Sequence, residues 1–208
     1  MKIFFIGCVE FSKELLGSII NISQIRIIGI ATKKASNFNS DHCDLSKIGK
    51  LNNIPFKYVR DINSSKTLDW INSLSPDLIF CFGWPSLLEL KLINIPKKGV
   101  VGYHPSELPL NRGRHPIIWA LVLGLKKTGS TFFLMDEGAD TGGVISQNIL
   151  KIKKDDDAES LYYKLIALSK KQLKQIISDF INDSVIITSQ TSQGNFWRKR
   201  EKKDGLID

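Results

Sequence analysis

A histidine and two aspartates in the middle of the chain are the side chains whose types and spacing best suit proton transfer. His104 follows an apolar run, and Asp136 and Asp140 lie further along in a glycine-rich turn. A histidine beside a carboxylate can act as an oriented acid–base pair. The same pairing serves about as often as a purely structural hydrogen bond, so these residues alone leave both interpretations open.

The elements that must position these residues follow from an alternation of short apolar runs with helical patterns. Such an alternation is typical of an α/β fold with a mainly parallel sheet. We predict strands over residues 2–7, 25–31, 56–59, 77–82, 99–103, 130–135 and 143–150, and helices over 11–19, 66–74, 116–123 and 158–180. His104 then stands at the carboxyl end of a strand, where open α/β sheets bind their ligands.

The expected fold is a Rossmann-like open sheet, mostly parallel, with mixed strands near the C-terminal half and helices on both faces. The turn after the first strand, residues 7–12, lacks the three glycines of dinucleotide-binding turns, so nicotinamide chemistry is not supported. The length fits one domain, predicted over residues 1–182, with a short C-terminal extension over 183–208. The polar segment 32–46 is predicted to be an exposed loop.

The formal net charge of +8 raises the question of nucleic-acid binding. Many lysines are scattered singly, and the densest basic run lies near the C-terminus, over residues 198–203. Basic residues are not interleaved with aromatic ones, as they are in single-strand binding grooves. We therefore favour a solvated basic surface and predict no nucleic-acid partner, while a small anionic ligand such as a diphosphate remains compatible.

The cysteines and histidines do not indicate a metal site. Cys8, Cys43 and Cys81 are far apart, and the three histidines have no paired spacing. Cys8 and Cys81 adjoin apolar runs and are expected in the core. His42 is expected in solvent and His115, before a proline, to be architectural. Reduced thiols suit a cytoplasmic protein, and no segment approaches the ~20 apolar residues that would cross a membrane.

Four stretches resemble the folate-dependent formyltransferases, and together they extend over essentially the whole chain. The central stretch is Gly-Tyr-His-Pro-Ser-Glu-Leu-Pro-Leu-Asn-Arg-Gly at 102–113, and the turn Asp-Glu-Gly-Ala-Asp-Thr-Gly-Gly at 136–143 follows it. The opening, 5–11, and the tail, 197–208, also look like that family. The two central motifs are specific, whereas the opening alone is not.

The resemblance implies a one-carbon transfer from N10-formyltetrahydrofolate to an amine. The acceptor amine attacks the formyl carbon, and His104 shuttles a proton while Asp140 orients and electrostatically tunes it. The pterin is implied to lie in an apolar pocket with backbone hydrogen bonds. The donor-binding residues implied in this way are Phe82, Gly83, Trp84, Leu87, Asp136, Gly138 and Ala139. Trp84 could equally be a packing residue. Asp136 is interpreted as a structural residue, and the proton-transfer role is given to Asp140.

Gly102 departs from the family pattern, which usually has asparagine two residues before the histidine. Loss of one such donor to the developing oxyanion costs about 2.7–4 kcal/mol of transition-state stabilisation. Three explanations compete: another donor such as Asn111 replaces it, protonated His104 acts alone, or the protein is a weak or repurposed relative. We favour a replaced donor, because the other motif residues are present.

The expected acceptor is a nucleotide-linked amino sugar of surface glycan biosynthesis. About two dozen residues follow the last helix, too few for a folded RNA-binding module, and the run 112–119 resembles the sugar-modifying branch. We predict substrate binding by Ser12, Asn111, Arg112 and Arg114, with phosphates on Arg112 or Arg114, Ser12 and the backbone amides after Gly7. Alternatively, the arginines pair with surface carboxylates.

The remaining alternatives are a glycinamide ribonucleotide or initiator methionyl-tRNA acceptor, or a non-catalytic relative that binds folate or nucleotide without turnover. The apolar positions Leu87, Leu88 and Ile93 are expected to face a partner if the protein forms a homodimer.

Overall fold

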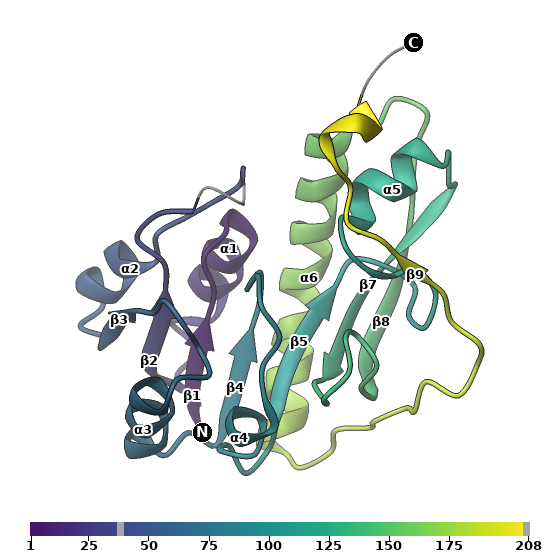
Figure 1. Cartoon of the computed structure of the whole chain (residues 1–208). Helices are drawn as coiled ribbons and strands as arrows, with labels where there is room; N and C mark the ends of the chain where they lie inside the picture. Colours follow the sequence, from purple (N-terminus) through teal and green to yellow (C-terminus); the bar gives the residue numbers. More distant parts are fainter. Residues whose placement is uncertain (37–39, 206–208) are drawn as a thin grey trace.

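A seven-stranded sheet with strand order β3-β2-β1-β4-β5-β7-β8 forms the centre of the protein in its computed structural model (Figure 1). The structure describes residues 1–36 and 40–205, so part of the predicted polar loop and the end of the tail lie outside the described residues. The strands are β1 (Lys2–Ile6), β2 (Arg26–Thr32), β3 (Phe56–Tyr58), β4 (Leu78–Cys81), β5 (Val100–His104), β7 (Lys127–Leu134) and β8 (Val144–Lys151).

The first five strands run parallel, whereas β7 and β8 are antiparallel to their neighbours. This arrangement confirms the predicted open sheet with mixed strands in the C-terminal half. Strands β1 and β4 are adjacent although the chain forms β2 and β3 between them, so β1/β4 is the point where the strand order reverses. Open α/β sheets bind ligands at the carboxyl ends of the strands around such a point.

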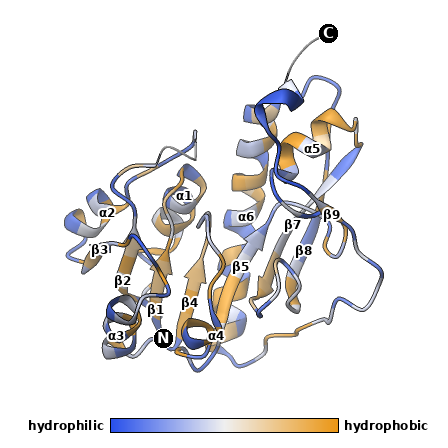
Figure 2. Ribbon diagram, in the orientation of Figure 1, coloured by the Kyte–Doolittle hydropathy of each residue, from blue (hydrophilic) through white to orange (hydrophobic). Residues whose placement is uncertain are grey.

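Apolar residues pack on both faces of the sheet, as the alternating side chains of β1 show. Ile3 and Phe5 belong to the core under α1 (Glu10–Ile19) and α6 (Ala158–Ile181), while Phe4 and Ile6 belong to the core under α3 (Ser65–Leu74) and α4 (Leu90–Ile93). Strands β1, β2 and β4 are correspondingly coloured mostly as hydrophobic (Figure 2). Strands buried on both faces are expected in a sheet that helices cover on both sides.

Helix α6 is long because its apolar positions repeat at helical spacing and its start is capped. The Asp157 side chain accepts a hydrogen bond from the Ser160 backbone N–H, and the Ser160 hydroxyl accepts one from Asp157 N. This reciprocal pattern satisfies backbone donors that a helix start leaves unpaired. The predicted helix over 158–180 is therefore confirmed, with its end at Ile181.

Several short elements were not predicted, because each has too few residues for a periodic pattern. They are α2 (Ser46–Leu51), α4, β6 (Arg112–Gly113), β9 (Phe196–Trp197) and a 3-10 turn at Lys202–Gly205. Cys8 and Cys81 are buried as expected. The suggestion that residues 87–93 face a partner is wrong for Leu88 and Ile93, which are buried in the core beside α4, whereas Leu87 is 58% exposed.

The chain after α6 returns across the molecule to the region around α5 (Pro116–Val122) (Figure 1). In this segment Thr188 forms an isolated antiparallel bridge with Val144. Further along, the chain forms β9, which pairs in parallel with β6. No helix among residues 1–36 and 40–205 combines the length and the apolar character that crossing a bilayer requires.

Candidate active site

His104 and Asp140 approach each other at the carboxyl edge of the sheet. His104 is the last residue of β5 and is 5% exposed, and Asp140 lies in the turn between β7 and β8. The distance from His104 Nδ1 to Asp140 Oδ2 is 3.4 Å. The two side chains that the sequence paired only by motif thus occupy one site.

The second ring nitrogen of His104 also faces an acceptor. Its Nε2 lies 2.8 Å from the backbone carbonyl oxygen of Asn111. A carbonyl oxygen only accepts hydrogen bonds, so Nε2 must carry a hydrogen in this arrangement. Asp140 Oδ2 accepts a further hydrogen bond from Gly113 N at 3.0 Å. Both ring nitrogens of His104 are therefore directed at oxygen acceptors that belong to two separate loops.

The turn that carries Asp140 accepts two hydrogen bonds from the side chain of Gln190. Gln190 Nε2 donates to the backbone carbonyls of Asp140 at 3.0 Å and Gly142 at 2.7 Å. Sequence reasoning missed Gln190, because a lone glutamine in a polar tail carries no chemical signature. The resemblance of the later tail, which begins at Trp197, did not extend to it.

Arg112, which is predicted to bind a phosphate, contacts two residues of the tail. Its Nε and Nη2 donate to Gln190 Oε1 at 3.1 and 2.7 Å, and its guanidinium lies over the Phe196 ring. Arg114 is exposed and its Nη2 lies 3.4 Å from the Pro85 carbonyl oxygen. Arg112 therefore supports the tail in this structure, and phosphate binding by Arg112 or Arg114 stays a prediction.

Asn111 takes part in the site through its backbone, and its side chain is bound elsewhere. Its Oδ1 accepts from Asn195 Nδ2 at 3.1 Å, and its N–H donates to Asn195 Oδ1 at 2.8 Å. Its φ of 62° is in the left-handed region, which turns its carbonyl oxygen toward His104. This arrangement gives Asn111 a structural role beside the histidine; its contact with substrate stays a prediction.

The predicted phosphate site at the start of α1 is occupied by protein groups. Ser12 is fully buried and its hydroxyl donates to the Phe82 carbonyl oxygen at 2.5 Å, so it does not reach a ligand directly. Glu10 N donates to the Asp41 carbonyl oxygen, and Phe11 N donates to the Tyr162 hydroxyl, both at 2.8 Å. The first two N–H groups of α1, those of Glu10 and Phe11, are therefore already paired with protein groups.

Tyr162 connects α6 to this helix start, and its loss should be measurable as a loss of stability. Its hydroxyl donates to Asp41 Oδ2 at 2.7 Å, and burial, followed by this carboxylate, raises the pKa of Tyr162 and keeps it protonated. Tyr162→Phe leaves the Phe11 N–H without its partner, so we expect the free energy of unfolding to fall by about 1–3 kcal/mol. Urea unfolding measures this change.

Tyr163→Phe is the matched control, because Tyr163 is the next residue of α6 and is half exposed. Its free energy of unfolding should stay within about 0.5 kcal/mol of wild type. Equal stability of the Tyr162→Phe variant and wild type would contradict the bridging role of the Tyr162 hydroxyl.

Gly102 lies directly opposite Phe133 across β5 and β7. A Cβ at position 102 would lie 2.9 Å from Phe133 Cζ and 3.0 Å from Met135 Cγ. Because such distances are too short for ordinary packing, an asparagine here would require Phe133 to move. Phe133 and Met135 thus occupy the space that a side chain at position 102 would enter.

The residues predicted to bind the folate donor divide into core and surface positions. Phe82 is fully buried, stacks on Phe80, and both its backbone N–H and carbonyl are hydrogen-bonded. Its predicted contact with a ligand is therefore corrected to a core role. Gly83 and Leu87 are exposed and Trp84 is half-buried beside them, with its Nε1 donating to Ser86 Oγ at 3.1 Å.

The other predicted donor-binding residues lie in the Asp140 turn. Asp136 Oδ1 accepts from Gly138 N at 3.1 Å and from the Thr141 hydroxyl at 2.6 Å, which fixes the shape of the turn. Gly138 and Ala139 are half-buried in the same turn. Met135, which precedes the turn, and Trp84 pack against the same apolar core. An apolar wall beside exposed backbone suits a flat heteroaromatic group.

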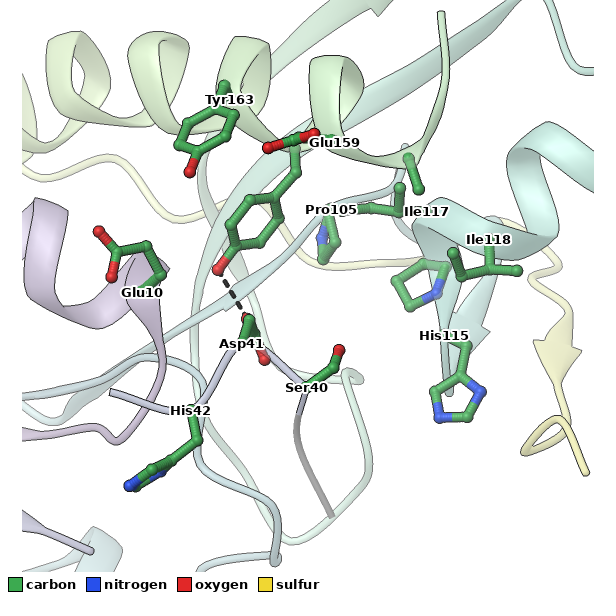
Figure 3. Close-up of a pocket in the computed structure, with 13 residues that line it drawn as sticks. Glu10, Ser40, Asp41, His42, Pro105, His115, Ile117, Ile118, Glu159 and Tyr163 are labelled. Atoms are coloured by element: carbon green, nitrogen blue, oxygen red, sulfur yellow. Dashed lines mark hydrogen bonds between the residues drawn. The ribbon is translucent and has the colours of Figure 1, made fainter. Parts of the chain in front are cut away.

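A cavity of about 670 Å³ lies between the start of α1, the segment 40–42, α5 and α6 (Figure 3). Pro105, next to His104, lines it, together with the carboxylates of Glu10, Asp41 and Glu159. His42 also lines it and is half-buried, which corrects the prediction that it is solvated.

His115 lines the opposite side of this cavity and starts α5 with a φ of 56°. Its Nδ1 accepts a hydrogen bond from Arg200 N at 3.3 Å. Burial, and then the charges of Arg114, Lys199 and Arg200, lower the pKa of His115. The cavity is therefore lined by carboxylates on α1, the 40–42 segment and α6, and on the opposite side His115 lies close to the charges of Arg114, Lys199 and Arg200.

Comparison with known proteins gives a family match over most of the chain. The family model described as formyl transferase matches residues 1–177. The bifunctional polymyxin resistance protein ArnA of Wigglesworthia glossinidia brevipalpis is 38% identical over 159 residues, which cover 74% of this chain. The chain spans only 24% of that relative's length.

Two further kinds of relative match more of their own length. The GDP-perosamine N-formyltransferase of Brucella melitensis is 31% identical over 185 residues, covering 89% of this chain and 70% of the relative. The methionyl-tRNA formyltransferase of Geobacter sulfurreducens is 28% identical over 213 residues, covering 100% of this chain and 67% of the relative.

The fold has a close counterpart among solved structures. WlaRD, a sugar 3N-formyl transferase solved in the presence of dTDP and 5-N-formyl-THF, superposes with a TM-score of 0.75 at 21% identity. The superposition covers 98% of this chain and 70% of WlaRD. At this identity the likeness establishes the shared architecture.

Proposed function

The chain belongs to the formyl transferase family, and on that premise we propose that it transfers a formyl group from N10-formyltetrahydrofolate to the amine of a nucleotide-linked amino sugar. The observation that carries the proposal is the approach of His104 to Asp140 at the carboxyl edge of the sheet, beside a cavity large enough for such an acceptor. The match to a GDP-perosamine N-formyltransferase over 89% of this chain supports an amino sugar as the acceptor.

The donor supplies an activated formyl group, and the residues that fit its heterocycle are those around the Asp140 turn. Trp84, Leu87 and the backbone of Gly83 would form one side, and the backbone of Asp136, Gly138 and Ala139 the other. These groups combine an apolar surface with backbone polar groups, the composition that small-molecule sites use to orient a flat ring.

His104 would manage the proton of the acceptor amine. Its Nε2 faces the Asn111 carbonyl oxygen at 2.8 Å and carries a hydrogen in that arrangement. For Nε2 to receive a proton, the incoming amine must displace that carbonyl and the ring must hold its single hydrogen on Nδ1, on the side of Asp140. Asp140 Oδ2, on the Nδ1 side, then stabilises the ring in its charged form. With Gly102 in place of an amide donor, the N–H of the charged ring is the group we assign to the developing oxyanion.

The cavity beside Pro105 would receive the acceptor. Three carboxylates and the hydroxyls of Tyr162 and Tyr163 on one side suit the hydroxyl groups of a sugar and disfavour phosphates. The basic groups around His115, namely Arg114, Lys199 and Arg200, place positive charge on the other side, where a diphosphate is expected.

A methionyl-tRNA acceptor is the second candidate, because the Geobacter sulfurreducens relative matches 100% of this chain. The net charge of +8 is compatible with it. The acid-lined cavity favours the sugar, since carboxylates repel the phosphates of a nucleic acid.

The proposal is tested by offering the full chain the folate donor together with one acceptor at a time. Panels of nucleotide-linked amino sugars, glycinamide ribonucleotide and initiator methionyl-tRNA are compared by mass spectrometry of the acceptor. We expect a formylated amino sugar to accumulate with the protein and not without it. Formylation of the tRNA or the ribonucleotide alone would overturn the sugar assignment, and donor binding without any transfer would identify a non-catalytic relative.

A further inference from the structure

The tail after α6 contacts both residues that the two ring nitrogens of His104 face, Asn111 and Asp140. Asn195 pairs with Asn111, whose carbonyl faces His104 Nε2, and Gln190 pairs with the turn of Asp140, whose carboxylate faces Nδ1. These tail residues lie beyond residue 177, where the family match ends. From this arrangement we infer that Gln190 is a positioning residue for the His104–Asp140 pair.

The amide of Gln190 fits this role because all of its polar capacity near the site is used. Its NH2 group donates to two carbonyls of the turn, Asp140 and Gly142, and its carbonyl oxygen accepts a forked pair from Arg112. Both types of bond require an amide, since a carboxylate cannot donate and a lysine cannot accept. Gln190 therefore joins the loop on the Nε2 side of His104 to the turn on its Nδ1 side.

The backbone of Asp140 needs such support. Asp140 has a φ of 60°, a left-handed conformation that is uncommon for residues with a side chain and persists where surrounding contacts determine it. The hydrogen bond from Gln190 to the Asp140 carbonyl is one such contact. Another is the bond from Gly113 N to Asp140 Oδ2, and Gly113 lies in β6, which pairs with β9 of the tail.

Gln190 does not touch His104 itself, so its effect reaches the ring through Asp140. Without the two bonds to the turn, Asp140 is free to leave the distance of 3.4 Å from Nδ1. Displacement of a catalytic group by about 1 Å lowers rates by up to about 10²-fold. The inference rests on the proposed formyl transfer only for its rate measurement, because the position of the ring can also be observed directly.

The experiment compares Gln190→Ala, Gln190→Glu and Gln193→Ala in the full chain. Gln190→Glu keeps an acceptor for Arg112 and removes the donors to the turn, while Gln193 is an exposed glutamine of the same tail. We expect kcat for formyl transfer to fall by about 10-fold in both Gln190 variants. KM for donor and acceptor should stay near wild type, and Gln193→Ala should match wild type in every respect.

Two readouts separate positioning from general stability. In an Asp140→Asn background, Gln190→Glu should cause no further loss of rate, because both changes remove the same interaction. Ring ¹⁵N NMR signals of His104 should move in Gln190→Glu and remain in place in Gln193→Ala. The NMR comparison holds even if no acceptor is formylated, which would reject the proposed function alone.

The inference is overturned if Gln190→Glu leaves the His104 ring signals unchanged. It is also overturned if Gln190→Glu slows transfer by the same factor with and without Asp140. Should Gln190→Ala fail to fold, the glutamate variant still decides the question.

Discussion

Replacing His104 with glutamine is expected to slow formyl transfer by about 10²–10⁴-fold, the usual contribution of a positioned acid–base group. Glutamine keeps an N–H that can reach the Asn111 carbonyl oxygen, now 2.8 Å from the ring, but it cannot take up a proton at neutral pH. The variant therefore retains the local hydrogen bond and loses only the proton transfer.

Single-turnover transfer with saturating donor and acceptor measures this loss without interference from product release. Binding of the folate donor, followed by fluorescence titration, should remain near wild type. His104 is 5% exposed, so the variant must also be compared with wild type by urea unfolding. Transfer at the wild-type rate by a folded His104→Gln protein would remove the imidazole from the mechanism.

Replacing Asp140 with asparagine is expected to slow transfer by about 10- to 10²-fold. An interaction with a charged group contributes about 1.5–3 kcal/mol, and the substitution removes the charge that faces Nδ1 at 3.4 Å. The amide oxygen can still accept from Gly113 N, now 3.0 Å from the carboxylate, so the shape of the turn is retained. The effect should therefore appear in kcat, with the donor and acceptor KM values little changed.

Asp155→Asn is the control for the removal of one negative charge, because Asp155 is exposed in the loop before α6, outside the site. Its rate should equal that of wild type. An Asp140→Asn protein that transfers formyl groups as fast as the Asp155→Asn control would show that the carboxylate contributes only to structure.

Long elements of the fold were predictable because their residues repeat with the period of the element. The buried strand β4 and the amphipathic helix α6 stand out from their flanks, and their observed bounds differ from the predicted ones by a few residues. Phe82 shows the limit of this reasoning. It continues the apolar run of β4 into the core, so its position in a motif did not place it at the ligand surface.

The pairing of His104 with Asp140 was predictable from the motifs, whereas the partners of the neighbouring residues were not. Arg112 is bound by Gln190, and the start of α1 is closed by Tyr162, both residues that lie far away in the sequence. A basic side chain and a helix N-terminus are correct signals for phosphate in isolation. Which of them remains available depends on how the tail and α6 fold back, and no local pattern contains that information.

The presence of glycine at position 102, where the family pattern has asparagine, also has a structural explanation. Gly102 has no side chain, and the ring of Phe133 on β7, directly opposite, occupies the space beside it. The pair therefore makes one packed unit, and the absence of asparagine is compensated in volume if not in hydrogen bonding. Under the proposed mechanism, stabilisation of the developing negative charge then depends on His104 and on the groups that orient it.

The most direct test of the account is a double-mutant cycle between His104→Gln and Asp140→Asn, read as single-turnover formyl transfer to the accepted amine. If the imidazole and the carboxylate work as one unit, the double variant will be as slow as His104→Gln alone, because Asp140 then has no ring to orient. If the two losses instead multiply, Asp140 acts independently of His104, and the central claim is contradicted.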